Sequence, residues 1–233
     1  MSTANDLAEI GALFGDPVRA NMVTLLMDGS RHAASELAAN AGVTRSTASW
    51  HLAKLQAGSL VDSVRSGRNR YFKLASPLTA QLIETALALA TRERRRHRPA
   101  TGADEIMKHA RTCYDHLAGR LGVAVADALI EKRWILLSQD GGEVTGRGER
   151  GLTRFGLDLT AIKKEKRIYC RPCLDWTERR FHLAGAIGAA LAQRCLDLGW
   201  VERLAGSRAL ELSKSGQAGF ARRFGVRLGT SST

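Results

Sequence analysis

Two short motifs in the second half of the sequence have the residue types and spacing of metal ligands. Cys113 and His116 form a Cys-x-x-His pair at a predicted helix start, and Cys170 and Cys173 form a Cys-x-x-Cys pair in a predicted loop. Thiolates and imidazoles are the ligands that hold zinc and related thiophilic metals in tetrahedral sites. If the fold brings these four residues together, they form a site for zinc or another thiophilic metal.

The same residue types also fit roles without a metal. His182 or His109 could replace one of the four ligands. Each cysteine could instead be a small core residue, and His116 and His182 could be structural histidines that hydrogen bond to the backbone. Cys170 and Cys173 could also form a redox-active thiol pair, because the neighbouring lysines and arginines would lower a thiol pKa.

The segment that follows these cysteines combines an aromatic ring with charged side chains. We interpret Asp175, Trp176, Arg179 and His182 as lining a pocket for a small effector molecule between two repeated units described below. The same segment also has the composition of a helix start, with Asp175 or Thr177 as the N-cap. The two interpretations are compatible.

Motifs typical of catalysis are missing from the sequence. It has no Gly-rich phosphate loop, no Gly-x-Ser-x-Gly and no His-Glu-x-x-His. Cys113 and His116 would make a nucleophile pair, but no third residue is apparent that would orient them. We therefore expect a protein that is not an enzyme and has no catalytic residues.

A different chemistry is indicated by cationic and short polar side chains between residues 44 and 73. Arginine and short polar side chains reach base edges and phosphates of DNA, and Arg45 could bind a guanine with two hydrogen bonds. A basic face that is merely solvated would carry the same charge. The residues we expect to contact DNA are Thr44, Arg45, Ser46, Thr47, Ser49, Trp50, His51, Lys54, Arg65, Arg68 and Arg70.

Helical periodicity and turn residues predict the elements that would position these side chains. Asp16 caps a helix that begins at Pro17. Residues 41–43 make a tight turn, after which Thr44 caps a further helix. Its buried side is formed by Ala48, Leu52 and Leu55, and its outer face is polar. From residue 60 to residue 74 the apolar period changes to two, which predicts a β-hairpin with a basic tip. This order of elements is typical of a winged helix-turn-helix.

From about Leu7 to Leu74 the chain resembles the ArsR family of bacterial repressors. The resemblance implies a homodimer that binds double-stranded operator DNA, with a recognition helix in the major groove and wings on the flanking backbone. Metal-sensing members often carry a Cys-x-Cys on the helix before the turn, which is absent here, so their sensing role is not carried over. The similar stretches are Phe14-Gly15-Asp16-Pro17-Val18-Arg19, Glu36-Leu37-Ala38, residues 44–55 and Gly67-Arg68-Asn69-Arg70-Tyr71-Phe72.

Two apolar helices are the natural dimer seam. One runs from about Leu7 to Phe14, and the other follows the wing. A dimer would space two recognition helices about one DNA turn apart, which implies a roughly palindromic operator. The apolar face of the second helix is formed by Leu78, Leu82, Ile83, Ala86, Leu87 and Ala90.

The second half of the sequence repeats itself. His116-Leu117-Ala118-Gly119 returns as His182-Leu183-Ala184-Gly185, and Trp134 returns as Trp200. Each unit reads as helix, strand, turn, strand, helix, which resembles a degenerate winged helix. The repeated helix faces are small and apolar and present no polar recognition helix. We therefore expect a sensing and dimer-supporting domain that contains repeats at about 107–160 and 173–228.

The composition of the chain limits the classes of protein to which it can belong. The 233 residues carry a net charge of +12, and 44% of them are apolar, which suits a folded chain with a polyanionic partner. No apolar run is long enough to span a bilayer and the N-terminus does not read as a signal peptide, so we expect a cytoplasmic protein without a membrane partner. The predicted fold is mainly α with small β-hairpins, divided into a winged helix-turn-helix domain at 1–98 and a C-terminal domain at 103–233.

These observations predict a sequence-specific DNA-binding transcriptional regulator. We expect a homodimeric repressor that a signal in the C-terminal domain, from a small molecule or a metal, releases from its operator. The alternative is a metal- or thiol-redox-responsive regulator that uses Cys113, His116, Cys170 and Cys173. A sequence-tolerant architectural DNA-binding protein and an enzyme are the remaining classes.

Overall fold

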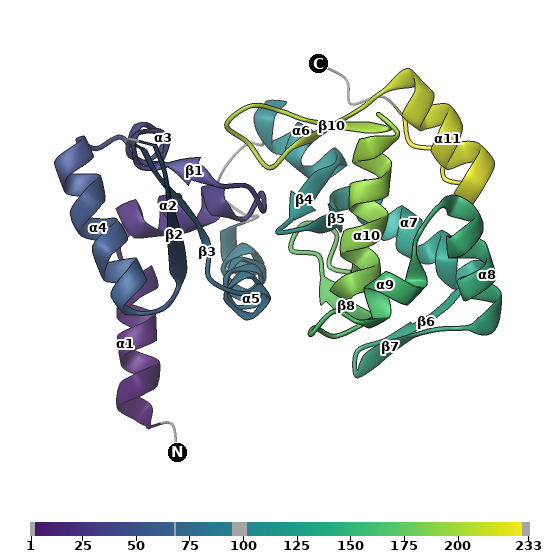
Figure 1. The fold of residues 1–233 in the computed structure, drawn as a ribbon, viewed down its shortest axis with the longest axis horizontal. Coiled ribbons are helices and arrows are strands. Elements are labelled where there is room, and N and C mark those ends of the chain that lie inside the picture. Colours follow the sequence, from purple (N-terminus) through teal and green to yellow (C-terminus); the bar gives the residue numbers. More distant parts are fainter. Residues whose placement is uncertain (1–2, 68, 95–101, 230–233) are drawn as a thin grey trace. The chain divides into compact units, whose positions relative to one another are not determined.

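The computed structural model describes residues 3–67, 69–94 and 102–229 (Figure 1). The chain divides into two compact units, Met1–Ile83 and Glu84–Thr233, and each is described separately. Residues 95–101, at the boundary between the two predicted domains, lie outside the described residues, as does Arg68. Among the described helices, none combines the length and the apolarity that crossing a membrane requires.

The first unit is a small helical domain with one antiparallel sheet. The strand order is β1-β3-β2, so the wing hairpin β2–β3 is extended by a two-residue strand that the sequence did not predict. Helix α5 begins in this unit and runs on into the second. The elements are α1 (Ala4–Phe14), α2 (Pro17–Leu26), β1 (His32–Ala33), α3 (Ala34–Asn40), α4 (Arg45–Ala57), β2 (Val61–Ser66), β3 (Asn69–Leu74) and α5 (Pro77–Arg94).

Local signals explain where the helices of the first unit begin. The Asp16 side chain accepts a hydrogen bond from the backbone N–H of Arg19 at 3.0 Å, so it caps α2 as predicted. Gly42, in the turn between α3 and α4, has a φ of +67°, a conformation that favours glycine. The core of the unit includes Met22, Leu26, Leu37, Leu52, Leu55 and Phe72, all 3% exposed or less.

The second unit contains two copies of one arrangement. Each copy consists of a β-hairpin, a 13-residue helix, a second hairpin and a shorter helix. The first copy comprises β4 (Arg111–Cys113), β5 (His116–Ala118), α7 (Gly119–Glu131), β6 (Ile135–Ser138), β7 (Gly141–Val144) and α8 (Gly146–Phe155). The second comprises β8 (Arg171–Leu174), β9 (Phe181–Ala184), α10 (Gly185–Asp197), β10 (Val201–Arg203), β11 (Leu210–Leu212) and α11 (Lys214–Phe224). Helix α6 (Gly102–His109) precedes the first copy, and α9 (Leu159–Lys163) lies between the two.

The mainly helical fold with small β-hairpins is therefore confirmed, but the first hairpin of each repeat is a correction. The sequence predicts His116 at a helix start, Cys173 in a loop and Asp175 or Thr177 at a helix N-cap. The structure places His116 and Cys173 in strands, and Asp175 in the turn between β8 and β9. Strands this short carry no clear period in the sequence, and they form because the partner repeat packs against them.

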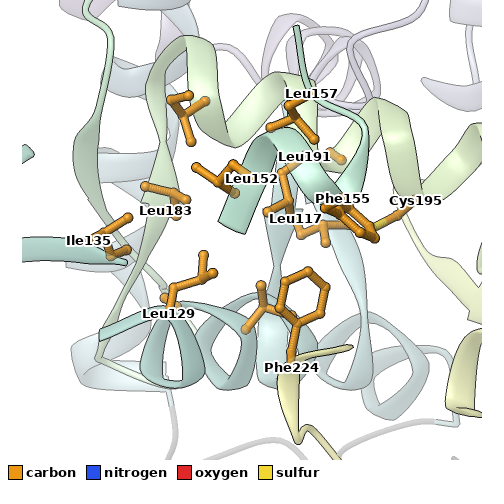
Figure 2. Close-up of a cluster of buried hydrophobic side chains, with 14 of the residues drawn as sticks. Leu117, Leu129, Ile135, Leu152, Phe155, Leu157, Leu183, Leu191, Cys195 and Phe224 are labelled. Atoms are coloured by element: carbon orange, nitrogen blue, oxygen red, sulfur yellow. The ribbon is translucent and has the colours of Figure 1, made fainter. Parts of the chain in front are cut away.

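Both copies share one hydrophobic core, part of which is seen in Figure 2. Leu117 of β5 and Leu183 of β9 both contribute to it, and so do residues of α7, α8, α10 and α11. The packing is exchanged, because β5 lies against α10 and β9 lies against α7. Neither copy therefore buries its hairpin by itself, which explains why the two fold as one unit.

Candidate functional site

The N-terminal half of α4 presents the polar surface that the sequence predicted. Thr44 caps the helix by accepting a hydrogen bond from the backbone N–H of Thr47 at 3.2 Å. The buried face is formed by Ala48, Leu52 and Leu55, each 1% exposed or less. Six of the predicted DNA-contacting residues on this helix and its cap, in addition to Lys54, are exposed: Thr44, Arg45, Ser46, Thr47, Ser49 and Trp50.

Trp50 is 54% exposed, which is unusual for so large an apolar ring. The Lys54 ammonium lies 4.0 Å from the centre of the Trp50 ring, a cation–π contact. This contact holds a positive charge beside a flat apolar surface on the outer side of α4. Both side chains are thus available to a partner of the helix.

His51 is a correction to the predicted outer face. Its ring is buried, and Nδ1 lies 3.5 Å from both Asp16 Oδ1 and Arg19 Nη1. Arg19 in turn donates to the carbonyl oxygens of Ala12 and Leu13. His51 therefore belongs to a polar contact between the start of α2 and α4, and its side chain does not face outward with those of Arg45 and Lys54.

The wing carries its charge on paired strands. Arg65 of β2 lies directly opposite Arg70 of β3, and both are exposed. The Arg70 guanidinium donates to Ser63 Oγ at 2.9 Å and to Gln56 Oε1 at 3.0 Å, which ties the wing to the end of α4. Like charges in direct cross-strand register are unfavourable on their own, so an anion bound here would stabilise the hairpin.

The second candidate site is a buried cluster of two cysteines and two histidines in the C-terminal unit. It consists of Cys113, His116, Cys173 and His182, whose ligand atoms all lie within 4.8 Å of one another. The two sulfurs are 3.8 Å apart and the two Nε2 atoms are 3.1 Å apart. All four side chains are 6% exposed or less. Three of the four predicted ligands are thus brought together, and His182 occupies the fourth place.

Cys170 is not part of this cluster. It lies in the hydrophobic core, and burial raises the pKa of its thiol to about 11. Along an extended chain, side chains three residues apart point to opposite faces, so Cys170 and Cys173 diverge. The structure thus pairs Cys173 with Cys113, whose sulfur lies 3.8 Å away, and places Cys170 in the core. Cys195 also lies in the hydrophobic core.

Hairpin register brings the cluster together. Cys113 lies opposite His116 in the β4–β5 pair, and Cys173 lies opposite His182 in the β8–β9 pair. Residues directly opposite each other on an antiparallel pair share a face, so each hairpin presents one sulfur and one imidazole on the same side. The cluster is therefore assembled from equivalent positions of the two repeats.

A carboxylate accompanies each imidazole. His116 Nδ1 lies 3.2 Å from Asp115 Oδ1, and His182 Nδ1 lies 3.2 Å from Asp175 Oδ2. Asp115 is itself paired with Arg167 at 2.6 Å. A carboxylate beside Nδ1 is the arrangement found behind metal-binding histidines. At His116 this contact is a hydrogen bond, whereas at His182 the carboxylate of Asp175 faces Nδ1 without forming one.

The electrostatics of the cluster are strongly coupled. The contact with Cys173, together with burial, raises the pKa of the Cys113 thiol, whereas the contact with Cys113 lowers the pKa of Cys173 well below its usual value, against the effect of burial. Burial lowers the pKa of His182, but the Cys173 and Asp175 side chains outweigh it and raise that pKa to about 9. The fold therefore stabilises a thiolate at Cys173, the form in which sulfur binds a metal.

The predicted effector-pocket residues have structural partners. Asp175 and His182 are fully buried. Trp176 lies over the Arg111 guanidinium at 4.7 Å, and Arg179 donates to the carbonyl oxygen of Ala88 at 2.8 Å. A surface pocket of about 470 Å³ lies instead beside the β6–β7 hairpin, and none of the four lines it.

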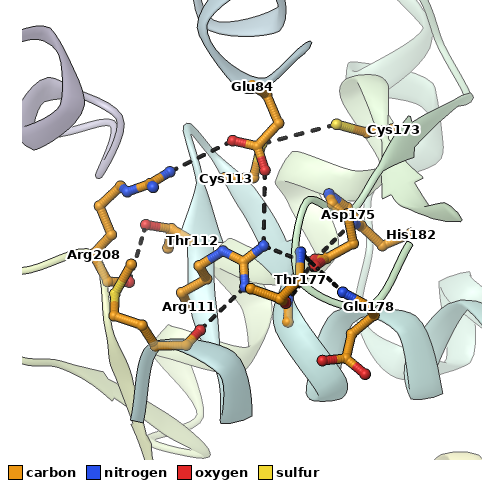
Figure 3. Close-up of polar contacts among 12 residues, drawn as sticks. Glu84, Arg111, Thr112, Cys113, Cys173, Asp175, Thr177, Glu178, His182 and Arg208 are labelled. Atoms are coloured by element: carbon orange, nitrogen blue, oxygen red, sulfur yellow. Dashed lines mark hydrogen bonds and ion pairs between the residues drawn. The ribbon is translucent and has the colours of Figure 1, made fainter. Parts of the chain in front are cut away.

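Sequence reasoning missed a buried charge network next to the cluster (Figure 3). Arg111 is fully buried and donates to Asp175 Oδ1 at 2.9 Å and to Thr177 Oγ1 at 3.1 Å. Glu84 of α5 lies 3.8 Å from Arg111 Nη2 and 3.5 Å from Arg208 Nη1. Burial disfavours the Asp175 carboxylate, but His182 and Arg111 outweigh burial and hold its pKa below the usual range.

One signal in the sequence could have identified both hairpins. Arg111-Thr112-Cys113 and Arg171-Pro172-Cys173 share an Arg-x-Cys pattern, and each precedes a His-Leu-Ala-Gly segment. Aligning the repeats on both patterns places Cys113 with Cys173 and His116 with His182. Cys170 then aligns with Ala110 and drops out of the ligand set.

Comparisons with known proteins agree with the first unit and extend beyond it. A family model described as a helix-turn-helix domain matches residues 14–64. CmtR of Mycobacterium tuberculosis, an HTH-type transcriptional regulator, is 35% identical over 89 residues, which cover 36% of this chain and 75% of CmtR. A solved structure of a homodimeric winged helix-turn-helix domain from Mycobacterium bovis, described as a possible ArsR-family regulator, is 25% identical and covers 42% of this chain and 89% of its own, with a TM-score of 0.37.

A protein from Bacillus subtilis (strain 168) is similar over nearly the whole chain. The uncharacterized HTH-type transcriptional regulator YdfF is 36% identical over 223 residues, which cover 96% of this chain and 99% of YdfF. Both halves of the present chain, including the repeated unit, are therefore shared with a regulator of this type. The predicted class of protein is confirmed: the chain belongs to the helix-turn-helix (HTH-type) transcriptional regulators.

Proposed function

We propose that this regulator is a sequence-specific repressor that binds a palindromic operator as a homodimer and is released by a signal received in residues 84–233. The observation that carries the proposal is the exposed polar surface at the start of α4, where Arg45 and short hydroxyl side chains follow the Thr44 cap. The start of a helix in the major groove is the part that reaches base edges.

Roles on the DNA follow from side-chain chemistry. Arg45 is long enough to bind a guanine with two hydrogen bonds, and such a contact discriminates between bases by about 1–3 kcal/mol. Lys54 lies further along α4 and would contact a phosphate, and Arg65 and Arg70 of the wing would do the same. Trp50 would pack its exposed ring against sugar or a thymine methyl group.

Exposed apolar residues support the homodimer. Helix α1 buries none of its side chains in the described chain, and Leu7 is 75% exposed. On α5, Leu78 and Leu82 of the predicted seam are 74% and 41% exposed, although Ile83 is buried within the chain. A second copy of this chain that covers these residues would remove apolar surface from water.

The C-terminal unit suits reception of a signal rather than DNA reading. Its repeated helices α7 and α10 have mostly buried faces of glycine, alanine and aliphatic residues. An effector would release the DNA only if it bound the non-binding conformation more tightly, by a few kcal/mol for a useful switch. The buried Cys113–Cys173 contact keeps a metal- or redox-responsive regulator as the second candidate.

Operator selection from a library of genomic fragments, followed by fluorescence anisotropy at several salt concentrations, tests the proposal. We expect the full chain to prefer selected DNA over random DNA, and Arg45→Ala to remove tenfold or more of that preference. Lys54→Ala should weaken binding to all sequences and reduce the slope of log affinity against log salt by about one.

Arg147 provides a matched control. It is exposed and lies in the first turn of α8 behind the Thr145 cap, much as Arg45 follows Thr44, but it belongs to a repeat that should not read DNA. Arg147→Ala should leave the preference unchanged. Equal affinity of the wild type for selected and random DNA would overturn the specific-repressor proposal in favour of an architectural protein. Sedimentation as a monomer at micromolar concentration would overturn the homodimer.

A further inference from the structure

We propose that Cys113, His116, Cys173 and His182 bind one zinc ion in a closed tetrahedral site that links the two repeats of the C-terminal unit. The ion would join β4–β5 of the first copy to β8–β9 of the second. This proposal concerns the folding of residues 84–233 and does not depend on the DNA sequence that the first unit recognises.

The distances match the edges of a zinc tetrahedron. With Zn–S near 2.3 Å and Zn–N near 2.0–2.1 Å, tetrahedral angles separate two sulfurs by about 3.8 Å and two nitrogens by about 3.3 Å. The structure has the sulfurs of Cys113 and Cys173 3.8 Å apart and the Nε2 atoms of His116 and His182 3.1 Å apart. Two thiolates and two imidazoles in this arrangement are a ligand set typical of zinc.

The orientation of the imidazoles points independently to a cation. Each Nδ1 lies 3.2 Å from a carboxylate oxygen, that of Asp115 for His116 and that of Asp175 for His182. The two Nε2 atoms face each other across 3.1 Å. A cation between them could be bound by both, and the two adjacent sulfurs would complete its ligands.

Each histidine lies against a glycine in the helix of the other repeat. A Cβ at Gly122 of α7 would lie 3.6 Å from the Cβ of His182, and a Cβ at Gly188 of α10 would lie 3.4 Å from the Cβ of His116. The same Cβ atoms would overlap the carbonyl groups of Leu117 and Leu183. Each histidine therefore packs on the helix of the other repeat, so an ion bound here would connect both copies.

Four buried protein ligands leave no position open for substrate or water. Zinc sites of this closed type stabilise a fold and do not catalyse reactions. Because the unfolded chain does not hold the four ligands together, the free energy of zinc binding would add to the stability of the C-terminal unit.

Cobalt substitution of the full-length protein tests the site directly. Chain purified with reductant and a chelator, then titrated with Co²⁺, should bind one ion with the intense d–d absorption of tetrahedral cobalt and a thiolate-to-cobalt charge-transfer band. Zinc should displace the cobalt and abolish both features. Absence of these bands from a chain whose circular dichroism shows it folded would overturn the proposal, as would the weak spectrum of octahedral cobalt.

Matched cysteine variants assign the ligands. Cys173→Ser should abolish the charge-transfer band or reduce it strongly, whereas Cys170→Ser removes an equally buried thiol from the core and should leave it unchanged. Equal loss in both variants would overturn the assignment. So would a Cys113–Cys173 disulfide, detected by mass spectrometry, in wild-type protein that binds no Co²⁺ after reduction.

A milder substitution keeps the test valid if the serine variant fails to fold. Asp115→Asn retains the size of the side chain but weakens the carboxylate behind His116, and should lower zinc affinity by about 10–100-fold. Asp140→Asn, in the exposed turn between β6 and β7, is its control and should leave affinity unchanged. Unchanged affinity in Asp115→Asn would contradict the role of His116 as a ligand.

Discussion

The two hairpins that open the repeats of the C-terminal unit have equivalent registers but different turns. Strands β4 and β5 are joined by the two residues 114–115, whereas β8 and β9 are joined by the six residues 175–180. The shared register positions both cysteines and both histidines in the same way. The longer turn places Asp175 in a fully buried position, whereas Asp115, the carboxylate beside the histidine of the first hairpin, is partly exposed.

This difference gives two equivalent arginines different environments. Arg111 and Arg171 both open their hairpins, opposite Ala118 and Ala184. Arg111 is fully buried and paired with Asp175, whereas Arg171 is partly exposed and donates to the carbonyl oxygen of Pro172. Symmetry thus governs the shared packing and the cysteine–histidine cluster, and the extra turn residues place the buried charge on one side.

The largest expected effect is a difference in stability between variants of these two arginines. Arg111→Ala would leave the carboxylates of Asp175 and Glu84 buried with less compensation, which should cost about 3–5 kcal/mol of unfolding free energy. Arg171→Ala removes a partly exposed side chain outside this network and should change stability by no more than about 0.5 kcal/mol. Urea unfolding followed by circular dichroism measures both values. Similar losses in the two variants would show that the asymmetric turn does not govern stability.

The same contrast explains which parts of the fold the sequence could predict. Helix α4 was predicted with its cap and its buried face, because Thr44 and the spacing of Ala48, Leu52 and Leu55 are local signals. The two-residue strand β1 carries no such signal and forms only because β3 offers it a partner. His51 was misplaced since its partners, Asp16 and Arg19, come from another helix.

The candidate metal site shows the same limit at the level of single residues. The ligand types and three of the four residues could be predicted from spacing. The choice between Cys170 and His182 depends on strand alternation in β8 and on the packing of one repeat against the other. The role of Glu84 was not predictable, because its partners Arg111 and Arg208 are distant in the sequence.

Substitution of the glycines that pack against Trp134 and Trp200 tests whether this shared contact stabilises both repeats equally. A Cβ at Gly151 or Gly219 would overlap the indole of Trp134 or Trp200, respectively. Gly151→Ala and Gly219→Ala should therefore each lower the free energy of unfolding by about 1–3 kcal/mol, and by similar amounts. A Cβ at Gly141 would meet no atom within 4 Å, so Gly141→Ala is the control and should not destabilise.

Thermal and urea unfolding of these three variants check the prediction. If only one of Gly151→Ala and Gly219→Ala strongly lowers the free energy of unfolding, the two repeats differ in packing as well as in their turns.

The smallest expected effect concerns the helix caps that the two repeats share. The Thr145 hydroxyl accepts from the N–H of Gly148 at 3.0 Å, and the Ser213 hydroxyl accepts from the N–H of Gly216 at 2.9 Å. Each hydroxyl also donates to a carbonyl before the strand, that of Arg133 or that of Gly199. Thr145→Ala and Ser213→Ala should each cost about 1 kcal/mol, the usual value of an N-cap.

The double variant Thr145→Ala/Ser213→Ala tests whether the two caps act independently. The two caps lie on different helices, α8 and α11, and no hydrogen bond of either reaches the other. Their effects should then add to about 2 kcal/mol, because independent sites are additive within a few tenths of a kcal/mol. Urea unfolding of both single variants and the double variant measures this sum. A loss well below the sum would mean that one broken cap already frees the helix of the other repeat, so that the copies are coupled through their shared core and not only through the cysteine–histidine cluster.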